Sequence, residues 1–156
     1  MIRFDAALDV IRQKAHSESA ALIESSKRFS VKELETKTDS LNIVLHDGLH
    51  DVDRHYTLDL PGAYQQFNLP AVVCTCEKLV EQGWKITEAD LRDALQHVKV
   101  LTGLSGRCET IHMAPRVVLD VAHNEDGIRA LMEQFSLPGG SDARLHVVIG
   151  VVKDKA

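Results

Sequence analysis

The sequence predicts an α/β fold, because amphipathic helical segments alternate with short runs of aliphatic and β-branched residues. An apolar share of 44% in 156 residues is enough to bury a core. A loop with two glycines and an arginine, residues 103–107, separates two such stretches and is the best candidate for a domain boundary.

The first stretch predicts a helix and then a β-hairpin. Apolar residues recur at helical spacing from Phe4 to Ala15, and residues 20–23 predict a short strand. Two further runs, 41–45 and 55–60, predict strands that reverse at Asp47-Gly48.

Two helices are expected next. The first covers about 69–82, with Pro70 in its first turn, Asn68 at or beside its N-cap and Gly83 after its end. The second begins at a capping box, TEAD at 87–90.

The second stretch predicts strand, helix, strand, which is one βαβ unit. The expected elements are strands near 108–112 and at 116–120, a helix over 124–135, a loop at 138–140 and a strand at 145–151. A lone βαβ unit cannot bury both faces of a sheet, so we expect the sequence to stop within a domain.

Composition narrows the function. A formal net charge of −5 with scattered Lys and Arg disfavours nucleic acid as a partner. No apolar run approaches the roughly 18 residues of a membrane span, and no secretory signal is visible. Cys74, Cys76 and Cys108 form no C-x-x-C pair, so we expect neither disulfides nor a zinc site, and a cytoplasmic location.

Two candidate binding residues follow the apolar strand at 116–120, at the edge where open α/β sheets bind ligands. Asp120 can accept hydrogen bonds from ribose hydroxyls, and His123 can meet phosphate oxygens near a helix N-terminus. The structural alternative is that Asp120 ends the strand and Asn124 caps the helix.

Three other segments carry candidate chemistry, each with a structural alternative. Arg107 presents a planar donor fork suited to phosphate, or belongs to a flexible linker. Amides over 62–68 can contact a purine edge, or cap a helix whose Tyr64 and Phe67 pack in the core. The loop 46–55 has metal-ligand residue types, although a solvated hairpin loop fits it better.

Several of these segments occur in an order that resembles the folylpolyglutamate synthase/dihydrofolate synthase family of the Mur ligase group. LPGAYQQFN at 60–68 is similar to the family's L-x-G-x-Y-Q-x-x-N, and GRCE at 106–109 to its G-R-x-E. LDVAHN at 119–124 is similar to D-G-A-H-N, with Val121 in place of glycine. The IG at 149–150 and KDK at 153–155 resemble a later strand and turn.

The resemblance implies that residues 1–103 close a P-loop-type central ATPase domain and that residues 107–156 open a Rossmann-like C-terminal domain. Asn68 would lie near adenine, Arg107 would contact phosphate, Asp120 would hold ribose, and His123 would approach the phosphate end. The implied partners are ATP, Mg²⁺, a folate-type substrate and L-glutamate, in a monomeric enzyme.

The resemblance places no catalytic residue or metal ligand in this chain, and no G-x-x-x-x-G-K-[ST] loop occurs in it. We therefore expect the isolated chain to be inactive. Whether the parent protein makes dihydrofolate, extends polyglutamate tails or does both stays open. Two alternatives remain: a cell-wall Mur ligase, which tends to carry His-Asn where this chain has Tyr64-Gln65, and a non-catalytic nucleotide-binding module.

Overall fold

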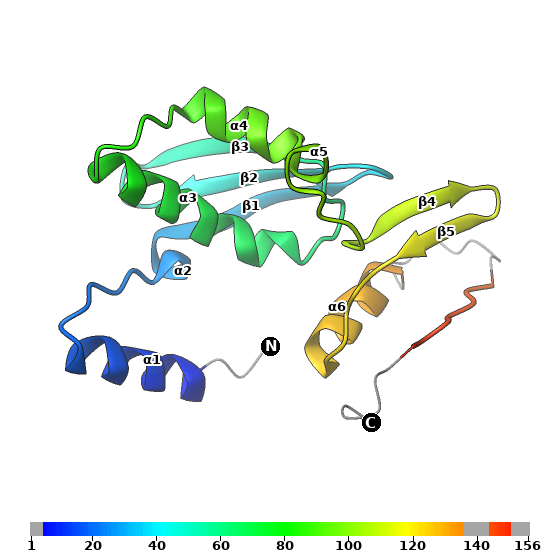
Figure 1. The fold of residues 1–156 in the computed structure, drawn as a ribbon, viewed down its shortest axis with the longest axis horizontal. Helices are drawn as coiled ribbons and strands as arrows, with labels where there is room; N and C mark the ends of the chain where they lie inside the picture. The colour runs from blue at the N-terminus through cyan, green and yellow to red at the C-terminus, as the bar shows by residue number, and fades with distance from the viewer. Residues whose placement is uncertain (1–4, 136–143, 151–156) are drawn as a thin grey trace.

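The structure, a computed structural model, describes residues 5–135 and 144–150 and confirms the α/β class. Figure 1 shows a three-stranded sheet under two helices, with a two-stranded hairpin and one helix beside it. No helix in the described ranges combines the length and apolar character that a bilayer crossing requires.

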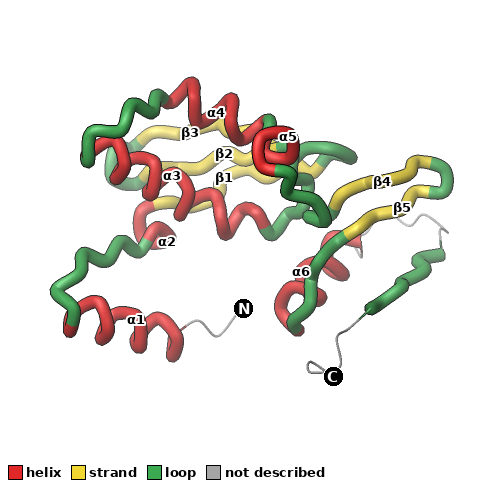
Figure 2. The backbone as a smooth tube through the Cα atoms, in the orientation of Figure 1, coloured by secondary structure: helices red, strands yellow, loops and turns green. Residues whose placement is uncertain are grey.

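The three-stranded sheet is antiparallel throughout, in the order β1-β2-β3. Its strands are β1 (Phe29–Thr36), β2 (Leu41–Asp47) and β3 (Val52–Leu58), preceded by helices α1 (Asp5–Ser17) and α2 (Ser25–Arg28). Helices α3 (Gln65–Glu81), α4 (Glu88–Gln96) and α5 (Val98–Thr102) follow, and α3 and α4 cover one face of the sheet (Figure 2).

The core lies between this sheet and helices α3 and α4. Alternate residues of β2 are buried because successive side chains of a strand point to opposite faces. The buried apolar side chains are Phe29, Leu41, Ile43, Leu45, Tyr56, Leu58, Leu60, Leu69, Val73, Cys74, Leu91 and Leu95. Strands β2 and β3 pair antiparallel on either side of Asp47-Gly48, which confirms the predicted hairpin.

We call the three-stranded sheet with its helices the first unit. The second unit begins after the predicted loop at 103–107. Strands β4 (Glu109–Met113) and β5 (Arg116–Leu119) pair antiparallel, and helix α6 (Glu125–Phe135) follows. Asn124 accepts a hydrogen bond from the N–H of Gly127 at 2.8 Å, so it caps α6.

Two local predictions were wrong, and one strand was missed. Residues 20–23 form no strand, whereas β1 was not foreseen. Helix α3 starts at Gln65, so Pro70 lies inside the helix and Asn68 is a helical residue rather than a cap. The side chain of Pro70 is buried, which favours its place inside the helix although proline donates no backbone hydrogen bond.

The expected closing strand of the βαβ unit is absent from the part of it that the structure describes. Residues 144–150 pair with no strand, and Val148 is 97% exposed. A strand buried on both faces needs neighbouring strands, and the described residues supply none at this position. Phe4, the loop at 138–140, Val151 and the KDK turn at 153–155 lie outside the described residues.

Candidate functional site

The carboxylate of Asp120 joins the two units. Its Oδ2 accepts hydrogen bonds from the hydroxyl of Tyr64 and from the N–H of Cys108, both at 2.7 Å. Its Oδ1 accepts from the N–H of Ala122, also at 2.7 Å. Segments 60–68, 106–109 and 119–124 of the sequence therefore meet at one side chain, and we call this meeting point the junction.

The turn before β4 brings its backbone to Asp120 through unusual φ angles. Gly106 has φ +71° and Cys108 has φ +56°, a region that non-glycine residues enter at some cost in free energy. A Cβ at position 106 would lie 2.7 Å from Cγ1 of Val121, so glycine is needed there. The Gly106 carbonyl also accepts from the N–H of Val121 at 3.0 Å, which aligns the two segments.

Tyr64 is held against the backbone that precedes it. A Cβ at position 62 would lie 2.6 Å from Cζ of the Tyr64 ring, so Gly62 makes room for the ring. Burial, followed by the nearby Asp120 carboxylate, raises the pKa of the Tyr64 phenol well above its usual range. The phenol therefore remains a hydrogen-bond donor at neutral pH.

Helix α6 is fastened to the same place through Gln134. Its side-chain oxygen accepts from the N–H of Ala63 at 2.9 Å, and its nitrogen donates to the carbonyl of Pro61 at 3.1 Å. The same nitrogen lies 3.2 Å from Sγ of Cys108. Burial, followed by Asp120, raises the pKa of this thiol to about 11, so it stays protonated.

The other predicted binding residues lie around this junction. Arg107 adjoins the Cys108 N–H that binds Asp120; it is half-buried, and no described residue forms an ion pair or hydrogen bond with its guanidinium. His123 is exposed, and its Nδ1 donates to the Val121 carbonyl at 3.0 Å. Asn68 is exposed on the first turns of α3 and donates to the side chain of Gln65 at 2.8 Å.

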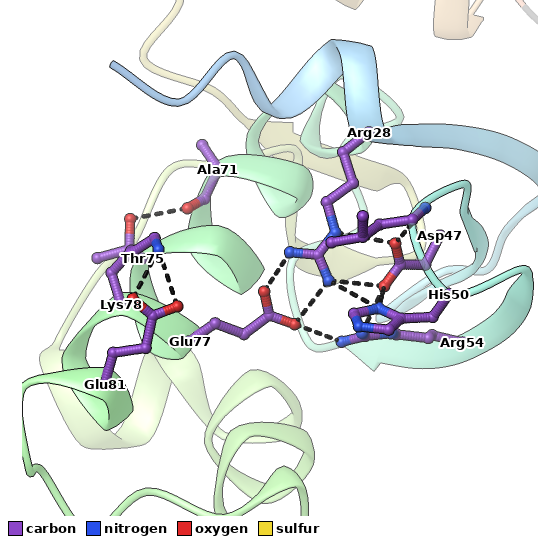
Figure 3. Close-up of polar contacts among 10 residues, drawn as sticks. Arg28, Asp47, His50, Arg54, Ala71, Thr75, Glu77, Lys78 and Glu81 are labelled. Atoms are coloured by element: carbon purple, nitrogen blue, oxygen red, sulfur yellow. Dashed lines mark hydrogen bonds and ion pairs between the residues drawn. The ribbon is translucent and has the colours of Figure 1, made fainter. Parts of the chain in front are cut away.

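A second polar cluster lies among α2, the β2–β3 hairpin and α3 (Figure 3). Asp47 is fully buried and accepts from Arg28 at 2.7 and 2.8 Å, from Arg54 and from His50. Glu77 on α3 accepts from both guanidiniums, at 2.9 Å from Arg54. Figure 3 shows the two arginines lying between the two carboxylates, which links α2, the hairpin and α3.

This cluster borders a cavity of about 400 Å³ between the hairpin and helices α3 and α4. Hydrogen bonds from Arg28 lower the pKa of Asp47, although burial opposes them, so the carboxylate is ionised at neutral pH. In the 46–55 loop, Asp47 is thus occupied by arginines and Asp53 by Lys32 and His46. Among the residues described, no group of three or more His, Cys, Asp or Glu side chains is placed to hold a metal ion.

Comparison with known proteins finds similarity to the Mur ligase group. Residues 106–156 match the family model for the Mur ligase glutamate ligase domain. The chain is 33% identical over 101 residues to the folylpolyglutamate synthase of Lacticaseibacillus casei, covering 62% of this chain and 21% of that one. It is 31% identical over 88 residues to a dihydrofolate synthase/folylpolyglutamate synthase of Buchnera aphidicola, covering 56% and 20%.

The likeness extends to three dimensions. A solved folylpolyglutamate synthase in complex with AMPPCP and folate superimposes with a TM-score of 0.69 at 27% identity, over 85% of this chain. These relatives make the chain similar to the folylpolyglutamate synthase/dihydrofolate synthase family. It spans 32% of that solved relative and about a fifth of the curated ones.

A cell-wall relative in the Mur ligase group also matches. The UDP-N-acetylmuramoyl-L-alanyl-D-glutamate–2,6-diaminopimelate ligase of Wolinella succinogenes is 31% identical over 74 residues, covering 47% of this chain and 15% of that one. The similarity to the folylpolyglutamate synthases extends over more of the chain.

Sequence reasoning overlooked the side chains that hold the junction together. Tyr64 was expected in the core as the structural alternative, yet its hydroxyl reaches Asp120, and Phe67 is 66% exposed. Gln134 had no local signal, because its backbone partners at positions 61 and 63 lie more than 70 positions earlier. The signal that could have found Tyr64 is Gly62, a small residue two positions before an aromatic ring.

Proposed function

We propose that this chain forms the hinge of the nucleotide site in an ATP-dependent ligase that joins L-glutamate to the carboxylate of a folate or dihydropteroate substrate. Residues 1–103 would close the central ATPase domain, and residues 107–156 would open the C-terminal domain. The observation that carries the proposal is the convergence of three family-like segments on Asp120.

The junction has the chemistry that a nucleotide requires. Asp120 keeps acceptor capacity for a ribose hydroxyl, because its three donors occupy three of about four lone-pair positions. Arg107 supplies a guanidinium without a carboxylate partner among the described residues, suited to phosphate oxygens. Asn68 offers an amide to adenine, and His123 lies beside the start of α6, where anions are favoured.

The reaction follows the resemblance. The substrate carboxylate attacks the terminal phosphate of ATP, which gives an acyl phosphate and ADP; the amino group of glutamate then attacks the acyl carbon, and phosphate leaves as the amide forms. Arg107 would offset negative charge on the transferring phosphoryl group. Mg²⁺ would neutralise phosphate charge, held by parts of the parent protein outside this chain.

The isolated chain is expected to have no ligase activity, because its sequence lacks a phosphate loop. We place the parent protein in the cytoplasm and expect it to be monomeric. Whether it makes dihydrofolate, lengthens glutamate tails or does both depends on the carboxylate it accepts.

The test is ADP release by the parent protein with ATP, L-glutamate and one acceptor at a time. We expect release with dihydropteroate or a reduced folate, and none with a UDP-N-acetylmuramoyl peptide. Release only with the peptide would establish the cell-wall alternative, which the Wolinella relative supports. Nucleotide binding without ADP release would favour the non-catalytic module, and glutamate addition by the 156-residue chain alone would contradict the expected inactivity.

A further inference from the structure

The donors around Asp120 are distributed unequally over its two oxygens. Oδ2 accepts from both the Tyr64 hydroxyl and the Cys108 N–H, which occupies its two lone-pair positions. Among the described residues, Oδ1 accepts from the Ala122 N–H alone. One acceptor position therefore remains, and it lies on Oδ1.

Tyr64 is the one side-chain donor of the three, so it is the one that the sequence can change without altering the backbone. Its ring rests against Gly62, where any Cβ would collide with it. The neighbouring Ala63 is held by the side chain of Gln134 at 2.9 Å. The hydroxyl therefore reaches Oδ2 from a constrained ring rather than from a mobile surface side chain.

We propose that Tyr64 is a positioning residue for the nucleotide: its hydroxyl occupies Oδ2 of Asp120 and so presents Oδ1 to one ribose hydroxyl. The inference rests on the proposed function, because it requires a nucleotide at this junction. It adds a specificity that the family resemblance did not supply, namely that a single ribose hydroxyl is read by Asp120.

The experiment measures KM of the parent ligase for ATP, 2′-deoxyATP and 3′-deoxyATP. In the wild type, one deoxynucleotide should have a KM about ten-fold or more above that of ATP, since a hydrogen bond to a charged group is lost. The other should resemble ATP. For each deoxynucleotide, the KM ratio is its KM divided by the KM of ATP. In Tyr64→Phe, Asp120 can rotate, and the larger of the two KM ratios should fall several-fold toward one.

The matched control is Tyr56→Phe, which removes the same hydroxyl from a buried tyrosine of β3 that is not hydrogen-bonded to Asp120. It should leave both ratios unchanged. A double-mutant cycle with Asp120→Asn tests whether Tyr64 acts through Asp120. In the Asp120→Asn background, Tyr64→Phe should produce no further change in the ratios.

A purely structural Tyr64 would raise KM for all three nucleotides by one common factor, and that result would overturn the inference. The wild-type ratios test it without any variant: equal penalties for both deoxynucleotides would also overturn it. If the wild type adds glutamate but uses the three nucleotides equally, positioning fails while the ligase function stands. If it adds no glutamate to any acceptor, the proposed function itself fails.

Discussion

The hydroxyl of Tyr64 and the carboxylate of Asp120 lie 2.7 Å apart, although 56 positions separate them in the sequence. This contact joins the start of α3, in the helix-covered sheet, to the end of β5, in the hairpin unit. A single hydrogen bond thus lies between the segment expected near adenine and the residue expected at ribose.

The turn at Gly106 predicts two costs of adding a side chain, backbone strain and overpacking, and comparison with Gly103 separates them. Gly103 and Gly106 have nearly the same φ, +69° and +71°, but a Cβ at 103 meets nothing within 4 Å. Gly103→Ala should therefore cost about 1 kcal/mol of unfolding free energy from left-handed backbone strain alone. Gly106→Ala should cost about 1–3 kcal/mol more, because it also overpacks against Val121.

Urea unfolding of the chain measures both variants. Adding Val121→Ala should recover most of the extra cost of Gly106→Ala, since it removes the methyl that the new Cβ meets. Equal destabilisation by the two glycine substitutions would show that Val121 does not crowd position 106.

Asp47 is expected to dominate the stability of the first unit. Asp47→Ala leaves Arg28 and Arg54 facing a buried site without their shared carboxylate, which typically costs about 3–5 kcal/mol. Asp53→Ala is the control, because Asp53 lies in the same hairpin but its ion pair with Lys32 is solvent-exposed and worth under about 1 kcal/mol. Comparable losses of unfolding free energy in the two variants would contradict this account.

The same carboxylate predicts a pH dependence. The pKa of Asp47 is lower in the folded protein than in the unfolded chain, where it is about 3.9, because Arg28 binds the charged form. The stabilisation is therefore complete above about pH 4 and is lost progressively as the pH falls below it. Thermal unfolding from pH 7 to pH 2 should show a shallower acid-side decline in Asp47→Asn than in wild type, and parallel curves would refute the assignment.

The capping box of α4 makes a smaller, local prediction. Thr87 accepts from the N–H of Asp90 at 3.1 Å, and the Asp90 carboxylate accepts from the N–H of Thr87 at 2.8 Å. Thr87→Ala should cost about 1 kcal/mol. Thr75→Ala within α3 should change stability little, because its hydroxyl donates to the Ala71 carbonyl rather than to an end of the helix (Figure 3). The measurement is the urea midpoint of unfolding of each variant, and equal midpoints for Thr87→Ala and Thr75→Ala would contradict the prediction.

The features predicted correctly are those whose signals are local. The capping box at Thr87 lies within four residues, and the hairpin at Asp47-Gly48 is marked by a turn between two apolar runs. Strand β1 was missed because most of its side chains are exposed and only Phe29 is buried, so its sequence lacks a sustained alternation of apolar and polar residues. The start of α3 was misplaced because Pro70 was assigned to a first turn, whereas tertiary packing tolerates it deeper in the helix.

The junction itself was foreseen in part. Arg107, Asp120 and His123 came from the family-like motifs, and the structure brings their segments together around Asp120. Their ligand contacts stay predictions. The arginine–carboxylate cluster was not foreseen, because Arg28 and Glu77 lie 49 positions apart and neither belongs to a motif. Long-range polar pairs of this kind leave no local pattern in one sequence.

The most direct test is a crystal structure of the parent protein with AMPPCP. The account predicts adenine beside Asn68, a ribose hydroxyl within hydrogen-bond distance of Asp120, and phosphate oxygens on Arg107 with His123 nearby. Nucleotide bound elsewhere, for instance in the cavity beside Arg28 and Glu77, with the junction residues untouched, would contradict it.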